Sequence, residues 1–169
     1  MTLNILILCS GNSARSILGE MLFRHLGADR VQARSAGSKP GGTVNPVALE
    51  ILAHHGIPCE DARSKSWDEF AVPGATEFDF IFTVCANAAN ETCPVWPGHP
   101  ITANWAIPDP AQVEPLHARR AAFETAYQSL RRRIQAFLAL PLETMGREES
   151  ALAARRIHEE CDKGRYKGG

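Results

Sequence analysis

The chain has 169 residues, a length that suits one domain with its own hydrophobic core. Its 18 basic and 19 acidic residues nearly cancel, which excludes a strongly basic nucleic-acid-binding protein. No run approaches the roughly 20 apolar residues that cross a bilayer, and the apolar run at 3–8 lacks the flanks of a signal peptide. We therefore expect a cytoplasmic protein with no nucleic-acid or membrane partner.

The first half of the chain predicts two strands, each followed by a helix. Leu3–Leu8 is almost entirely apolar, as in a buried strand. Asn45 and Pro46 are a typical helix start, and Gly56 is a typical stop. The predicted elements are a strand at 3–8, a helix at 14–26, a strand at 31–35 and a helix at 46–56.

The second half predicts two more strands and then two helices. The segment 78–84 is rich in aromatic and β-branched residues, which favour strands. The predicted elements are strands at 78–84 and 101–105 and helices at 115–138 and 146–161. This alternation indicates an α/β fold, a three-layer sandwich with a four-stranded parallel sheet. We expect one domain, with residues 1–140 as its main part and 141–169 as a helical extension.

Two cysteines follow predicted strands of this sheet. Cys9 comes after the first strand, and Cys85 comes after the third. Ligands of parallel α/β sheets bind at the carboxyl ends of the strands. We therefore expect Cys9 and Cys85 to face the same edge.

Residues 9–16, Cys-Ser-Gly-Asn-Ser-Ala-Arg-Ser, join the first predicted strand to the first predicted helix. In that position, successive backbone N–H groups converge on a tetrahedral oxyanion at a helix N-terminus. Arg15 would add a bidentate fork to two of the anion's oxygens. The candidate oxyanion-binding residues are Ser10, Gly11, Asn12, Ser13, Ala14, Arg15 and Ser16.

Within this segment, Cys9 is the candidate nucleophile. The positive field of the loop is expected to lower its thiol pKa, and Ser16 to donate a hydrogen bond to the thiolate. Asn12 is expected to hold the loop through bonds to the loop backbone. The alternative is a buried cysteine at a strand end and a surface arginine. A cation in a first helical turn is unfavourable, however, so Arg15 needs an anionic partner.

This segment resembles the Cys-x5-Arg-Ser loop of low-molecular-weight protein tyrosine phosphatases and of the arsenate reductases that share their fold. Asp109-Pro110 is similar to the Asp-Pro motif that supplies the general acid in this superfamily. Taken alone, Asp109 would be an ordinary turn residue. The resemblance covers most of residues 3–140 and implies the low-molecular-weight tyrosine-phosphatase type of fold.

Cys85 and Cys93 distinguish a reductase from a phosphatase. A phosphatase needs one cysteine, whereas a reductase must deliver two electrons, which thiols supply by forming a disulfide. The segment around Cys85 and Cys93 resembles that of three-cysteine arsenate reductases coupled to thioredoxin. The alternatives are a metal site, although no zinc-type spacing is present, or two unrelated cysteines. Cys59 is expected to serve packing, and Cys161 to be incidental in a polar tail.

The resemblance implies a relay in which Cys9 attacks arsenic, Cys85 forms a disulfide with Cys9, and Cys93 then resolves it. Arg15 and Asp109 complete the candidate catalytic set. Arsenate is the expected substrate and thioredoxin the expected external reductant, with glutaredoxin or a small thiol as alternatives. A phosphomonoester phosphatase is the alternative function, and a non-catalytic oxyanion- or metal-binding regulatory module is a third.

No bound cofactor is expected. Some reductases of this fold hold a potassium ion near the loop, and Asn12, Glu20 and Ser35 match three of its ligand positions. The segment Ser64-Lys65-Ser66 does not supply the others, and Lys65 would place a fixed cation nearby. The prediction is therefore no metal, with potassium at these three residues as the alternative.

Overall fold

The computed structural model describes residues 2–86 and 96–162. Four parallel strands form one sheet in the order β2-β1-β3-β4. The strands are β1 (Leu3–Leu8), β2 (Val31–Ala36), β3 (Phe80–Thr83) and β4 (Ile101–Asn104). The helices are α1 (Arg15–Gly27), α2 (Pro46–His54), α4 (Leu116–Leu138) and α5 (Arg147–Asp162), with short 3-10 helices η1 (Ala28–Arg30) and η2 (Trp67–Phe70).

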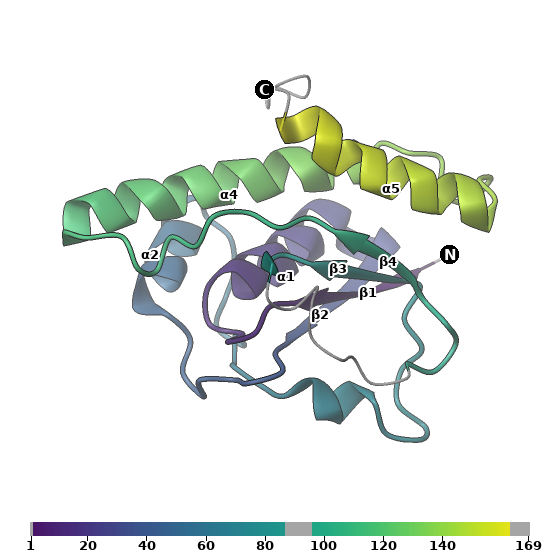
Figure 1. The fold of residues 1–169 in the computed structure, drawn as a ribbon, viewed down its shortest axis with the longest axis horizontal. Coiled ribbons are helices and arrows are strands. Elements are labelled where there is room, and N and C mark those ends of the chain that lie inside the picture. The colour runs from purple at the N-terminus through teal and green to yellow at the C-terminus, as the bar shows by residue number, and fades with distance from the viewer. Residues whose placement is uncertain (1, 87–95, 163–169) are drawn as a thin grey trace.

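The layers of this fold are visible in Figure 1. Helix α1 lies between α4 and the sheet, α5 runs beside α4, and the segment that contains η2 lies on the lower side of the view. The predicted α/β class and four-stranded parallel sheet are confirmed. Within the described parts of the chain, no helix combines the length and apolarity that a membrane crossing needs.

The structure shortens the strand that the sequence predicts at 78–84. The β3 ladder begins at Phe80; just before it, Asp79 N donates to Asn4 O and the Asp79 carboxylate accepts from Asn4 N, both at 2.8 Å. The two 3-10 helices were not predicted, since such short turns carry no 3.6-residue periodicity. The other predicted boundaries differ from the observed ones by only one or two residues.

An aromatic cluster joins the sheet to the helices that cover it. Phe82 of β3 lies 4.0 Å from Trp105 and 5.2 Å from Phe137 of α4, measured between ring centroids. Phe23 of α1 stacks on Phe82 at 5.6 Å. All four side chains are at most 1% exposed. Burying rings of this size supplies a large share of the hydrophobic stabilisation of the domain.

Helix α5 is fastened to this core by polar contacts. Trp105 Nε1 donates to the α5 carbonyl of Ala154 at 2.9 Å. Arg133 of α4 is 2% exposed, donates to His158 Nδ1 at 3.2 Å and forms an ion pair with Asp162. Cys161 is only 7% exposed, so its predicted place in a polar tail is wrong. The helical pattern of 146–161 continues far enough to turn Cys161 inward.

The Arg133 contacts predict that this side chain contributes to stability by holding α5 against α4. Arg133→Met keeps the packing of the aliphatic stem but removes the charged hydrogen bonds to Asp162 and His158. We expect a loss of about 2 kcal/mol in the free energy of unfolding, or roughly 4–8 °C in Tm, measured by calorimetry. The control is Arg156→Met on the exposed face of α5, which should leave Tm almost unchanged. If Arg133→Met and Arg156→Met lowered Tm equally, the conclusion that the Arg133 contacts hold α5 would be contradicted.

Candidate active site

The Cys9 loop (residues 9–16) connects β1 to α1, and its carbonyl oxygens are held outward by the segment 39–45. The hydrogen bonds join Lys39 N to Ser10 O (2.9 Å), Gly41 N to Gly11 O (3.1 Å) and Asn45 N to Ser13 O (2.9 Å). In a planar trans peptide, the carbonyl group and the next N–H group point in opposite directions. The N–H groups of residues 11, 12 and 14 therefore point to the inner side of the loop, as an oxyanion site requires.

Gly37 is a site residue that sequence reasoning missed. A Cβ atom at this position would lie 2.4 Å from Ser10 O and 2.7 Å from Cys9 O, so only glycine lets the segment after β2 pass this close to the loop. Cys9 N also donates to Ala36 O at 3.3 Å. The run of small residues at 35–38 was the available signal for this close approach.

The Asn12 side chain anchors the loop from below. Asn12 has a φ of 45°, in the left-handed region that asparagine tolerates better than most residues. Its Nδ2 donates to Ser16 Oγ at 2.9 Å and to Ser35 Oγ at 3.0 Å, and its Oδ1 accepts from Lys65 N at 2.8 Å. The prediction that Asn12 bonds the loop's own backbone is corrected: its side chain bonds the Ser16 hydroxyl at the end of the loop, and Ser35 and Lys65 outside it. The expected bond from Ser16 to the Cys9 thiolate stays a prediction.

Cys85 lies directly beside Cys9. Ser10 N donates to Cys85 Sγ at 3.3 Å, and Ser10 Oγ is 3.8 Å from the same sulfur. Both cysteines are buried, with exposures of 6% for Cys9 and 3% for Cys85. The structure therefore brings together the two thiols that the sequence placed at one sheet edge. Cys93 lies outside the described residues.

The pKa of the Cys9 thiol is raised in this arrangement. The main cause is the hydrogen bond between the thiols of Cys9 and Cys85, followed by burial. Arg15 and the Gly11 N–H group act in the opposite direction but are outweighed. The prediction of a lowered pKa is therefore wrong for this state. The sequence placed Cys85 at the same sheet edge but did not show that its thiol would contact the thiol of Cys9, so this effect on the pKa was not predicted.

Arg15 and Asp109 face each other across the loop opening. Arg15 Nη2 lies 3.7 Å from Asp109 Oδ2, and Arg15 Nη1 donates to Ile107 O at 2.9 Å. Asp109 Oδ1 accepts from Ala111 N at 2.9 Å, which is the turn contact that the sequence also allowed. Asp109 is thus both a turn residue and a neighbour of Arg15, and its side chain is 38% exposed.

The three residues considered for potassium lie together beneath the loop, with the Lys65 ammonium among them. Ser35 Oγ donates to Glu20 Oε1 at 2.6 Å and accepts from Lys65 Nζ at 3.4 Å. Among the residues that the structure describes, no three His, Cys, Asp or Glu side chains gather closely enough to hold a metal ion.

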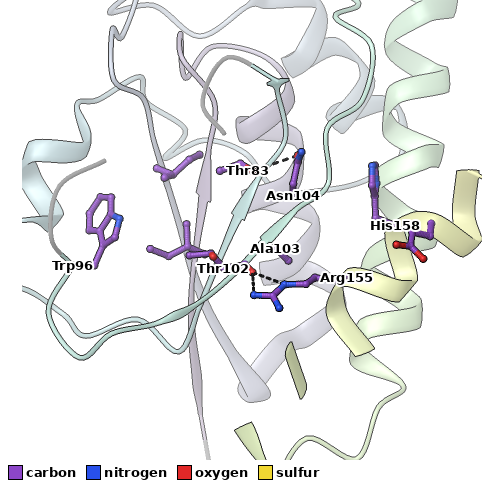
Figure 2. A pocket seen from close by; sticks show the side chains of 10 residues that line it. Thr83, Trp96, Thr102, Ala103, Asn104, Arg155 and His158 are labelled. Carbon is purple, nitrogen blue, oxygen red and sulfur yellow. Dashed lines mark hydrogen bonds between the residues drawn. The ribbon is translucent and has the colours of Figure 1, made fainter. Parts of the chain in front are cut away.

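A separate cavity of about 500 Å³ lies on the β4 side of the sheet. Figure 2 shows Arg155 and His158 of α5 at one side of this cavity and Trp96 at the other, with Arg155 bonded to Thr102 O. Of the described residues, Cys9, Arg15, Cys85 and Asp109 are absent from its lining. The cavity is therefore distinct from the Cys9 loop.

Comparison with known proteins gives three findings. The family described as low molecular weight phosphotyrosine protein phosphatase matches residues 4–151. An arsenate reductase of Shouchella clausii is 32% identical over 134 residues, which is 79% of this chain and 93% of the relative.

Two solved structures also superpose well. A thioredoxin-dependent arsenate reductase of Corynebacterium glutamicum has a TM-score of 0.54 at 24% identity, and the match covers 79% of this chain but 62% of that longer protein. A tyrosine phosphatase of Erwinia amylovora has a TM-score of 0.61 at 26% identity over 80% of this chain and 90% of that one.

The thiol contact predicts a measurable change in Cys9. Cys85→Ala removes the main cause of the raised pKa, so more Cys9 thiolate should be present at a given pH. At pH ~7 we expect the iodoacetamide reaction rate of Cys9 to rise about tenfold or more, because one pKa unit is tenfold in thiolate. Peptide mapping by mass spectrometry measures the rate. Cys59→Ala is the control. If Cys9 reacts no faster in Cys85→Ala than in Cys59→Ala, the assigned effect of Cys85 on the Cys9 pKa is contradicted.

Proposed function

The chain belongs to the low molecular weight phosphotyrosine protein phosphatase family and is an arsenate reductase of that family; from this we propose how its residues reduce arsenate to arsenite. The observation that carries the proposal is the Cys85 thiol beside Cys9, with Ser10 N at 3.3 Å from the Cys85 sulfur. Hydrolysis of a phosphate ester has no use for a second thiol there, whereas reduction requires one.

The Cys9 loop would hold arsenate through its inward N–H groups. Arg15 begins α1 at the loop's end and would contribute its guanidinium fork to two arsenate oxygens. The helix N-terminus adds the positive end of its dipole. Arsenate would thus be bound as a tetrahedral anion directly above the Cys9 sulfur.

The first chemical step is displacement at arsenic. Cys9 thiolate attacks arsenic and forms an S–As bond, while an As–O bond breaks and the oxygen leaves as water with a proton from Asp109. Because the hydrogen bond with Cys85 raises the pKa of the Cys9 thiol in this structure, Cys85 would move aside or take up the Cys9 proton first.

The second step transfers two electrons. Cys85 thiolate attacks the Cys9 sulfur, and the S–As bond breaks with its electron pair left on arsenic, which leaves as arsenite. A Cys9–Cys85 disulfide remains. Cys93 thiolate would then attack Cys85, release Cys9 and leave a Cys85–Cys93 disulfide. An external reductant closes the cycle, and we propose thioredoxin, on which the Corynebacterium glutamicum protein depends.

A phosphomonoester phosphatase is the second candidate. Cys9, Arg15 and Asp109 are the residues that such an enzyme requires, and the Erwinia amylovora neighbour is a tyrosine phosphatase. Ala111 and Gln112 stand after Asp109-Pro110, where the phosphatases that this segment resembles typically carry tyrosine. We therefore expect phosphatase activity to be a weak side reaction.

A coupled assay tests the function. With thioredoxin, thioredoxin reductase and NADPH, the wild-type protein should oxidise NADPH only when arsenate is added, and p-nitrophenyl phosphate should be hydrolysed slowly. Cys9→Ser should lose both activities, because a hydroxyl offers no thiolate. Cys59→Ser is the matched control and should keep them. Rapid ester hydrolysis without arsenate-dependent NADPH loss would favour the phosphatase instead.

The relay is tested by removing its last thiol. Cys93→Ser enzyme given one portion of arsenate should release one equivalent of arsenite and accumulate the Cys9–Cys85 disulfide, because nothing resolves it. Thiol blocking followed by peptide mapping identifies the bridge. The Cys85→Ser enzyme lacks the thiol that forms this disulfide, so arsenite should not be released by that route. A trapped bridge that contains Cys59 or Cys161, or sustained turnover of Cys93→Ser with thioredoxin, would contradict the relay.

A further inference from the structure

A buried polar cluster beneath the Cys9 loop contains a lysine that the reaction does not use. Lys65 is 6% exposed. Its Nζ donates to Ser35 Oγ at 3.4 Å and to Arg63 O at 3.1 Å, and it lies 3.9 Å from Glu20 Oε1. Burying an ammonium group is costly unless it is paired, so these contacts need an explanation.

Lys65 is connected to the loop in two ways. Its backbone N–H group bonds Asn12 Oδ1 at 2.8 Å, and its ammonium group bonds the Ser35 hydroxyl that also accepts from Asn12 Nδ2. Asn12 is the loop residue with positive φ, and its side chain is fully buried. A change in the Lys65 ammonium group therefore reaches the loop backbone through two side chains, Ser35 and then Asn12.

Glu20 explains why a cation is needed at this place. Its carboxyl group is 2% exposed, and burial raises its pKa, whereas Lys65, Ser35 and Arg24 act to lower it. Arg24 contacts the other carboxylate oxygen, Oε2, at 2.8 Å and is shared with Asp61. Lys65 is therefore the cation on the Oε1 side, which faces Ser35 and the loop.

The residues do not fit a bound potassium ion. Asn12, Glu20 and Ser35 offer suitable oxygens, but Asn12 Oδ1 accepts from Lys65 N and Ser35 Oγ accepts from both Asn12 Nδ2 and Lys65 Nζ. An ion bound to Glu20 Oε1 and Ser35 Oγ would lie against the Lys65 ammonium and be repelled. The Lys65 ammonium group, which is part of the chain, occupies the place that a monovalent cation would take.

We propose that Lys65 is a positioning residue that acts as a built-in monovalent cation and holds the Cys9 loop in its anion-binding shape. The protein then binds oxyanions independently of potassium. The proposal rests on the proposed function in one respect, that the Cys9 loop is the oxyanion site. It concerns binding and not turnover, so it is tested with inorganic phosphate, which has the shape of arsenate and is not reduced.

The experiment compares phosphate affinity by titration calorimetry in potassium chloride and in choline chloride at equal ionic strength. For the wild-type protein, the dissociation constants should agree within about twofold, since no ion site is left to fill. Lys65→Met should bind phosphate about tenfold more weakly in choline chloride and recover at least about threefold in potassium chloride, because potassium can enter the vacated place.

Two control variants distinguish a positioning role of Lys65 from a general effect of its charge or of altered folding. Glu20→Gln combined with Lys65→Met removes both charges, so the double variant should show no difference between the salts. Arg34→Met removes an exposed cation of β2 and should also respond equally in both salts. Tm measured in the two salts gives a second readout: potassium chloride should raise Tm for Lys65→Met alone, whatever its affinity for phosphate.

Each other outcome overturns the proposal. Stronger phosphate binding by the wild-type protein in potassium chloride would show that a cation site remains. Equal weakening of Lys65→Met in both salts, with no effect of potassium on Tm, would make Lys65 a packing residue only. A wild-type protein that binds no phosphate in either salt would overturn the oxyanion role of the Cys9 loop and this inference with it.

Discussion

The direction of the peptide groups in the Cys9 loop is the constraint on which the site depends. A loop of eight residues can point its N–H groups inward only if the opposite carbonyl groups are satisfied elsewhere, because an unpaired buried carbonyl is costly. The segment after β2 meets this need with three backbone N–H groups, and Gly37 allows it to approach. The second strand is thus part of the active site, although it contributes no reacting atom.

The same reasoning explains why the site lies deep in the fold. Strand β1 is central in the sheet, and its partners β2 and β3 deliver different parts of the site to its carboxyl end. From β2 come the peptide groups and hydroxyl that shape the loop, and from β3 comes the second thiol. This is the edge at which open α/β sheets bind their ligands, where the connections from a central strand diverge.

Sequence patterns predicted the strands, the main helices and the location of the loop, because each is a local property of consecutive residues. They did not reveal contacts between distant segments. Lys65 and Asn12 are 53 residues apart, and Cys85 and Ser10 are 75 apart. The error about the Cys9 pKa has this origin, since the sequence placed Cys85 at the same sheet edge but did not show that its thiol would contact the thiol of Cys9. Gly37 was missed because close packing, unlike a turn, leaves no fixed motif.

In the proposed reaction, the proximity of Cys85 to Cys9 would serve one step and oppose another. The pairing of Leu8 with Thr83 in neighbouring strands fixes the ends of β1 and β3 side by side, which brings the sulfurs within reach for a disulfide. That nearness also raises the pKa of Cys9 and suppresses the thiolate needed for the first attack. The conflict cannot be relieved in the strands, where the ladder fixes the backbone. In the proposed reaction, the residues after Thr83 would relieve it, through a movement of Cys85 away from the fixed end of β3.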